Sequence, residues 1–224
     1  SALGWVTAKV LRPGAERKGI TFFAVTFANT VFLGFPVIEA MYGADGIFIA
    51  TISNIPFNLM AYTVGYGAVR GGMKGLTLRK ALAPPLVASF VAVLIFLSGV
   101  EIPEFVADCF GSMSGATIPM SMLIVGTSLG SVSLKGAAEN WRVFVVVAIK
   151  LIVAPILVWL VTSLFVKDEM LLGVIVVLSS APTAMIATIF AIEAGRDEGY
   201  ASECVFIGTV LSALTMPLMI WLLL

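Results

Sequence analysis

The sequence predicts an all-α integral membrane protein, a polytopic helix bundle, and three observations support this prediction. Of the 224 residues, 60% are hydrophobic and only 12% are charged, and the mean hydropathy is +1.09. A soluble domain carries about 25% charged residues, so this chain has too few polar side chains to cover a water-exposed surface. Long apolar runs recur, and a bilayer core needs about 20 such residues per helix. These runs are apolar on every side, which favours helices over the alternating strands of a barrel.

Seven apolar runs are predicted to span the membrane. They cover residues 20–41, 47–68, 81–100, 113–132, 143–166, 170–193 and 201–223. The connections between them are short and include no linker, so residues 1–224 are predicted to form a single transmembrane domain. The short apolar run at residues 2–6 is interpreted as the end of an eighth helix, and the chain is therefore expected to lack N-terminal segments.

The distribution of lysine and arginine predicts the orientation in the membrane. Eleven of these residues fall in connections on one side, whereas only Lys167 falls on the other. Short loops rich in Lys and Arg remain in the cytoplasm, so the basic side is predicted to be cytoplasmic and the C-terminus to lie outside. The eleven residues are Lys9, Arg12, Arg17, Lys18, Arg70, Lys74, Arg79, Lys80, Lys135, Arg142 and Arg196. The expected location is the plasma (inner) membrane.

The residue types present argue against several classes of function. The chain contains no histidine, which removes the commonest general base and a common metal ligand. Its two cysteines, Cys109 and Cys204, fit no metal motif and no disulfide framework. No nucleophile motif and no pair of carboxylates lies at membrane depth. We therefore expect no enzyme, no catalytic or metal-binding residue, no cofactor and no nucleic-acid partner.

Three predicted spans contain helix-breaking residues near mid-membrane. They are Ala28-Asn29-Thr30 with Gly34-Phe35-Pro36 in the first span, Ser53-Asn54-Ile55-Pro56-Phe57-Asn58 in the second and Ser179-Ser180-Ala181-Pro182-Thr183 in the sixth. Proline removes a backbone donor, and the groups it frees must face protein or a water-lined cavity. Each break alone is also explained by an ordinary kink or a helix contact. The first and sixth spans, which contain two of these breaks, cross the membrane in opposite directions, and this indicates a secondary transporter with inverted repeats. We predict that these two helices approach each other at Asn29 and Pro182.

Several short motifs follow one another in the order typical of one transporter family. They are Asn29-Thr30, Gly34-Phe35-Pro36, Tyr42-Gly43, Asn58, Thr63-Val64-Gly65, Gly126-Thr127-Ser128-Leu129, Lys150 through Pro155, Ala181-Pro182 through Gly195, and Ser212-Ala213-Leu214-Thr215-Met216-Pro217. Over essentially its whole length the chain resembles the auxin efflux carrier family, in the superfamily of the bile acid/sodium symporters. That family includes the plant PIN-FORMED carriers and bacterial carriers of malonate, malate and similar acids.

This resemblance implies ten helices in two inverted repeats of five, with the fourth and ninth helices unwinding and crossing at the midplane, where substrate binds. By position, the crossing points would be Ala28-Asn29 and Pro182-Thr183, and this chain would begin at the end of the third helix. Plant members have proline before the asparagine and an amide after the second proline, whereas this chain has Ala28 and Thr183. Among carboxylates such as malonate, malate or auxin-like acids, a smaller acid is therefore expected rather than auxin.

The candidate substrate-binding residues lie at these breaks and on one further span. They are Asn29, Thr30, Pro36, Asn58, Lys150, Pro182 and Thr183. Half-helix N-termini offer free N–H groups and partial positive charge to an anion, and Asn29 and Thr183 would add side-chain donors. Lys150 is the only basic residue well inside a span; either it raises the potential for an anion, or it extends to the cytoplasmic face.

Alternatives to an organic-anion carrier working by alternating access stay open. A sodium-coupled carrier of the bile-acid-symporter type is one, although no cluster of buried carboxylates indicates a sodium or proton relay. A channel is the other, but it would need a continuous polar line or a charged ring, whereas the polar residues gather at the helix breaks. The expected partners are a small organic anion and the lipid bilayer; a homodimer stays open.

Overall fold

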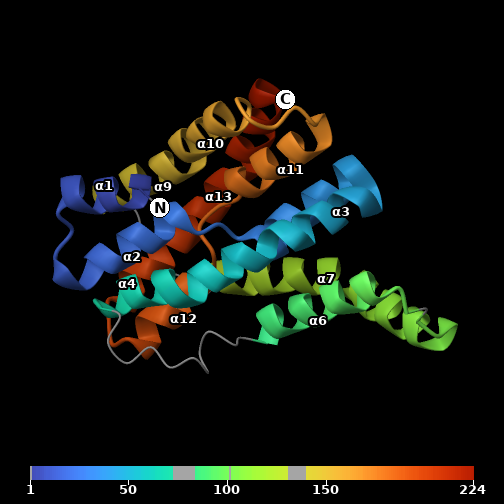
Figure 1. Cartoon of the computed structure of the whole chain (residues 1–224). Helices are drawn as coiled ribbons and strands as arrows, with labels where there is room; N and C mark the ends of the chain where they lie inside the picture. The colour runs from blue at the N-terminus through green and yellow to red at the C-terminus, as the bar shows by residue number, and fades with distance from the viewer. Residues whose placement is uncertain (1, 73–83, 101, 131–139) are drawn as a thin grey trace.

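The computed structural model describes residues 2–72, 84–100, 102–130 and 140–224, which are almost entirely helical (Figure 1). The helices, with single π-helical turns marked η, are α1 (Ala2–Leu11), α2 (Ala15–Thr26), η1 (Thr30–Gly34), α3 (Phe35–Met60), η2 (Ala61–Gly65), α4 (Tyr66–Arg70), α6 (Pro84–Ser98), α7 (Glu104–Gly130), α9 (Trp141–Ala148), η3 (Ile149–Val153), α10 (Ala154–Thr162), α11 (Glu169–Ser180), α12 (Ile186–Glu193) and α13 (Glu198–Leu223). The predicted all-α class is confirmed for these residues.

Gly43 turns α3 back on itself, so this element consists of two antiparallel legs. Its φ of 62° and ψ of −150° are accessible to glycine and strained for other residues. Thr30 Oγ1 donates to Asn54 Oδ1 at 2.9 Å. A straight helix would hold these two residues about 36 Å apart. The two legs, blue and cyan in Figure 1, correspond to the predicted spans at residues 20–41 and 47–68.

Some helices in the described residues are long and apolar enough to cross a membrane, as judged by length and composition. They are Thr30–Arg70, Trp141–Thr162 and Glu198–Leu223. Large apolar side chains are exposed on their outer surfaces, as expected for helices that face lipid. The number of seven crossings stays a prediction. Residues 81–83 and 131–132 of the predicted spans lie outside the described residues, as do Lys74, Arg79, Lys80 and Lys135.

Helix α2 forms the centre of the bundle and positions the first break. Residues 19–25 are all buried, and they pack against α1, α4, α9, α12 and α13. Gly19 allows α2 to approach α4 closely, because a Cβ at this position would overlap the backbone of Ala68 in α4. In contrast, α6 and α7 lie at one edge of the bundle beside α3 and η1 (Figure 1). The break after α2 therefore follows directly on a fully buried segment that contacts five other helices.

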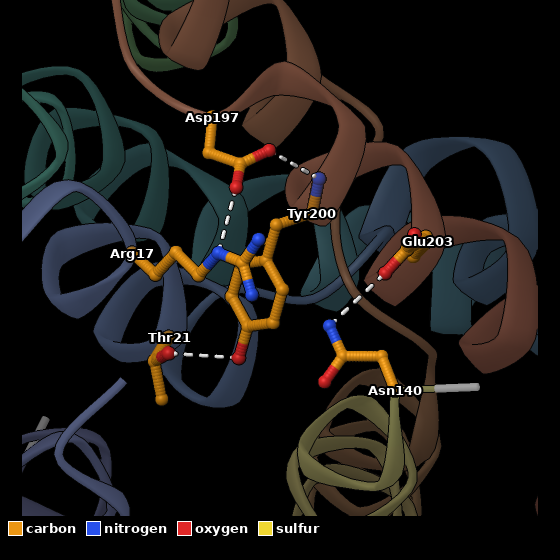
Figure 2. Close-up of polar contacts among 6 residues, drawn as sticks. All are labelled: Arg17, Thr21, Asn140, Asp197, Tyr200 and Glu203. Carbon is orange, nitrogen blue, oxygen red and sulfur yellow. Dashed lines mark hydrogen bonds and ion pairs between the residues drawn. The ribbon is translucent and has the colours of Figure 1, made fainter. Parts of the chain in front are cut away.

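A polar cluster ties the first turns of α2 to the start of α13 (Figure 2). Arg17 Nε donates to Asp197 Oδ2 at 2.6 Å, and the guanidinium lies 5.1 Å from the centroid of the Tyr200 ring. Asp197 also caps α13, because its Oδ1 accepts from the Tyr200 N–H at 2.9 Å. The Tyr200 and Thr21 hydroxyls are hydrogen-bonded at 3.0 Å. This cluster lies on the side predicted to be cytoplasmic.

Two further polar contacts join helix ends on the same side. Asn140 Nδ2 donates to Glu203 Oε2 at 3.3 Å, which links the start of α9 to α13 (Figure 2). Arg196 donates to the carbonyl of Arg70 at 2.7 Å, which links the turn before α13 to the end of α4. The ends of α2, α4, α9 and α13 are therefore fastened to one another by polar side chains.

Candidate functional site

Two transmembrane helices are interrupted, and both interruptions coincide with the predicted breaks. The first helix ends as α2 at Thr26 and resumes as η1 at Thr30. The second ends as α11 at Ser180 and resumes as α12 at Ile186. Helix ends inside a membrane leave backbone groups without helical partners, and these groups must be satisfied by protein or by a polar cavity.

The two unwound segments meet through an antiparallel β-bridge between Ala28 and Thr183. Its two backbone hydrogen bonds run from Asn29 N to Pro182 O at 2.7 Å and from Ala184 N to Phe27 O at 3.1 Å. The predicted approach of the two helices at Asn29 and Pro182 is therefore confirmed. An inverted repeat relating the two halves stays a prediction.

Side chains satisfy carbonyl groups that the breaks set free. In an unbroken helix, the carbonyl of Ala24 would accept from residue 28, and that of Ser179 from residue 183. Because the helices end at Thr26 and Ser180, the N–H groups of residues 28 and 183 are not in helical position, and both carbonyls need other donors. Thr183 Oγ1 donates to the Ala24 carbonyl at 3.0 Å, and Lys150 Nζ donates to the Ser179 carbonyl at 3.3 Å.

A cavity of about 580 Å³ lies against the crossing. Polar residues line one part of it: Thr26, Thr30, Ser53, Asn54, Lys150, Thr162 and Ser179. The rest of the lining is mostly apolar, with Val25, Ala28, Phe57, Ala154, Leu157, Val158, Val161, Ile175 and Leu178, and with Ala2, Leu3 and Gly4 of α1. The cavity therefore combines a small polar region at the helix breaks with an extended apolar wall.

Among the described residues that line the cavity, Lys150 is the only charged one, and it is only 3% exposed. It belongs to the π-helical turn η3, which immediately precedes Pro155 near the start of α10. Such wide turns redirect side chains and are frequent at functional sites. Its ammonium group bonds to Ser179 inside the bundle, so the side chain does not extend to the predicted cytoplasmic face. Within the described part of the chain, no carboxylate lies within ion-pair distance of Lys150.

Two buried polar atoms beside the crossing lack a hydrogen-bond partner within the described residues. They are Nδ2 of Asn29, a residue only 4% exposed, and Oγ1 of Thr26, which lines the cavity. A buried donor without a partner costs about 1–3 kcal/mol, and in a native protein it calls for an explanation. The bridge fixes the backbone of Asn29, while its side-chain amide nitrogen has no hydrogen-bond partner among the described residues.

The structure brings some of the predicted site residues together and leaves others apart. Thr30 and Lys150 line the cavity. Asn29, Pro182 and Thr183 form the crossing beside it, where the Thr183 hydroxyl is already engaged by a backbone carbonyl. Pro36 and Asn58 are partly buried but lie outside the lining of this cavity. Binding of substrate by these seven residues stays a prediction.

Asn54 and Ser53 line the cavity, although the sequence did not single them out as site residues. Asn54, in the second leg of α3, is buried, and its Oδ1 accepts the hydroxyl proton of Thr30 in η1. Asn54 lies one helical turn before Asn58, in the same polar motif, and it is Asn54 that lines this cavity. Only the reversal at Gly43 decides which amide faces the break.

The fold and the crossing define an α-helical membrane transporter with discontinuous helices. A family described as membrane transport protein matches residues 1–75 and 69–220 of the chain. The chain therefore belongs to this family, that of the auxin efflux carriers.

Two archaeal relatives cover most of the chain, and each is known only as an uncharacterized transporter. The protein from Methanothermobacter thermautotrophicus is 28% identical over 218 residues, which are 96% of this chain and 70% of the relative. The protein from Methanocaldococcus jannaschii is 27% identical over 216 residues, which are 93% of this chain and 70% of the relative. Family and relatives together support a non-enzymatic membrane transporter.

Proposed function

We propose that the protein is a secondary carrier of small organic anions, which bind in the cavity beside the crossing. The observation that carries this proposal is the buried ammonium of Lys150, the only charged group in the lining. A buried charge is costly unless it is paired. Its one hydrogen bond goes to a neutral carbonyl, so a carboxylate on the cargo would supply the missing counter-charge.

The dimensions and the lining of the cavity favour a small acid with an apolar part. Binding pockets for small molecules commonly measure about 300–1,000 Å³, and this cavity measures about 580 Å³. Lys150 and the side-chain N–H groups of Asn54, whose Oδ1 accepts from Thr30, would hold the carboxylate in the polar region, while the apolar wall accepts the rest of the molecule. A second carboxylate would find no second cation among the lining residues.

The position of the cavity supports alternating access. Lys150 is followed along the same helix by Thr162, about 18 Å further from the predicted cytoplasmic side, and both residues line the cavity. On the opposite side of the crossing, α2 and α13 are fastened by Arg17 and Asp197. In this conformation cargo would enter from the outer side. We further propose that the basic loops are cytoplasmic and that the protein resides in the plasma membrane.

Binding to the purified protein tests the anion assignment. Calorimetric titration with acetate, malonate, malate and an aromatic monocarboxylate is expected to show saturable binding, and an amine of similar size is expected to show none. Lys150→Met should abolish carboxylate binding, and Lys150→Arg should retain part of it because the charge is kept. A preference for the amine, or equal binding by the wild type and Lys150→Met, would contradict the proposal.

Flux in vesicles distinguishes a carrier from a channel. A carrier gives saturable uptake and accelerated exchange when unlabelled cargo is present on the opposite side. A conductance that rises linearly with concentration would favour the channel instead.

A further inference from the structure

The end of α11 at the crossing is an electronegative position within the membrane. The last four carbonyl groups of a helix have no helical donors, and together they carry about half a negative charge. Here the helix ends at Ser180, so residue 183, which would donate to the Ser179 carbonyl in a continuous helix, lies in the unwound segment beside Ala28. Ser179 lines the cavity, and a cation is electrostatically favoured at its carbonyl because this carbonyl belongs to the helix end.

A cation is already present there, and the chain itself provides it. Lys150 Nζ donates to the Ser179 carbonyl at 3.3 Å, and the lysine side chain is almost completely buried. Lys150 reaches this carbonyl from another helix, at the π-helical turn η3. In carriers driven by ions, the C-terminal ends of half-helices and unwound carbonyls coordinate the coupling Na⁺ or H⁺. The ammonium group therefore stands where such a carrier would hold its ion.

We propose that Lys150 is a built-in replacement for a coupling cation at the end of α11, so that the protein binds no sodium at this position. Removing the ammonium would leave the Ser179 carbonyl without its donor, in a cavity whose lining also includes Thr30 and Asn54. A hard cation such as sodium prefers oxygen ligands of this kind. The lysine thus excludes sodium while presenting a fixed positive charge to the cavity. This inference concerns the ion and holds for whichever cargo is carried.

Thermal unfolding of the purified full chain tests this proposal. The Tm is measured in sodium chloride and in N-methyl-D-glucamine chloride, at equal ionic strength and without any organic acid. The wild type is expected to have the same Tm in both salts. Lys150→Ser makes room for an ion and adds an oxygen. Its Tm is expected to be about 3–5 °C higher in sodium, at a sodium concentration tenfold above the dissociation constant.

Two matched variants separate an ion site from a general effect of salt. Lys150→Arg keeps the positive charge, and Lys150→Met fills a similar volume without charge or oxygen, so neither should respond to sodium. The proposal is overturned if sodium raises the Tm of the wild type, or if Lys150→Met responds as Lys150→Ser does. It is also overturned if Lys150→Ser has equal Tm values in the two salts, or fails to fold in both. Because no carboxylate is present, these outcomes are independent of the test of the proposed function.

Discussion

At the scale of single residues, the backbone and the side chain of Asn29 and of Thr183 make different contributions to the crossing. The backbone N–H of Asn29 holds the bridge by donating to Pro182, while its side-chain amide remains without a partner among the described residues. The backbone of Thr183 also belongs to the bridge, but its side chain is engaged, since the hydroxyl donates to the Ala24 carbonyl. Of these two residues, Asn29 is therefore the one with a donor to spare for a ligand.

Asn29→Ala should weaken carboxylate binding about ten- to hundredfold, because a lost hydrogen bond to a charged group costs about 1.5–3 kcal/mol. Folding should be little affected, since alanine keeps the bridge and removes an unsatisfied buried donor. Calorimetric titration and thermal unfolding measure the two effects. Ser98→Ala, at the exposed end of α6, is the control and should leave affinity unchanged. An unchanged affinity in Asn29→Ala would remove this residue from the site.

Asn54→Ala and Asn58→Ala form a matched pair that tests the position of the cavity. Asn54 lines the cavity and bonds to Thr30, whereas Asn58 lies one turn further along and outside the lining. We expect Asn54→Ala to reduce carboxylate affinity about tenfold, in line with one lost hydrogen bond of about 1.4 kcal/mol. Asn58→Ala should change it by less than about twofold. The opposite order in titrations would favour the amide indicated by the sequence.

At the scale of elements, turns and caps set how the helices return to the crossing. The reversal at Gly43 brings the second leg of α3 onto η1, and this contact places Asn54 beside Thr30. Asp197 begins α13 by capping its first turn and also binds Arg17 of α2. These short segments determine which helix faces meet.

Gly43→Ala should destabilise the protein through the backbone alone. The φ of 62° and ψ of −150° at this position cost a residue with a Cβ about 1–3 kcal/mol, although nothing lies within 4 Å of where that Cβ would be. Gly72→Ala is the control, because its Cβ also meets open space and its φ is not in the left-handed region. Thermal unfolding in detergent should show a lower Tm for Gly43→Ala alone. Equal Tm values would mean that the reversal does not require glycine.

Asp197→Ala and Asp197→Asn separate the helix cap from the ion pair. Alanine removes both interactions and should lower the free energy of unfolding by about 1–2 kcal/mol. Asparagine can still cap α13 and should lower it by about 0.5 kcal/mol or less, because the Arg17 and Asp197 side chains are 37% and 24% exposed and solvent screens the pair. Denaturant titration compares the two variants. Equal losses would assign the whole effect to the ion pair.

At the scale of the whole molecule, a well-packed bundle surrounds the crossing, and α6 and α7 lie along one edge (Figure 1). In the predicted orientation, the cavity lies on the outer side of the crossing, and the polar cluster around Arg17 and Asp197 lies on the inner side. This arrangement is compatible with the proposed alternating access, in which a binding region opens to one side of the membrane at a time.

Chemical labelling of single cysteines tests the predicted orientation. Cys109 is exposed and is first replaced by serine, whereas Cys204 is buried. In intact cells, Lys167→Cys should react with a membrane-impermeant maleimide, and Arg70→Cys should react only after permeabilisation, because basic connections are retained in the cytoplasm. Labelling of Arg70→Cys alone in intact cells would show the opposite orientation.

The sequence by itself determined the helical membrane class and the two interruptions that cross. Apolar composition excludes a water-exposed surface wherever the chain folds, and proline disrupts helical hydrogen bonding at its own position. The positions near Asn29 and Pro182 could therefore be predicted locally, and the bridge between them agrees. Their opposite direction across the membrane was also readable from the alternating charges of the connections.

Only the tertiary structure decided which side chains share the cavity. Lys150 was equally compatible with the cytoplasmic face and with the bundle interior, and its contact with Ser179 depends on how two distant helices pack. Asn54, and not Asn58, lines the cavity, because the second leg of α3 turns this residue toward Thr30. Contacts between residues far apart in the chain depend on the rotation and crossing of whole helices. One helical turn is enough to exchange the residue that faces a cavity for one that faces away, and no local pattern in the sequence records that rotation.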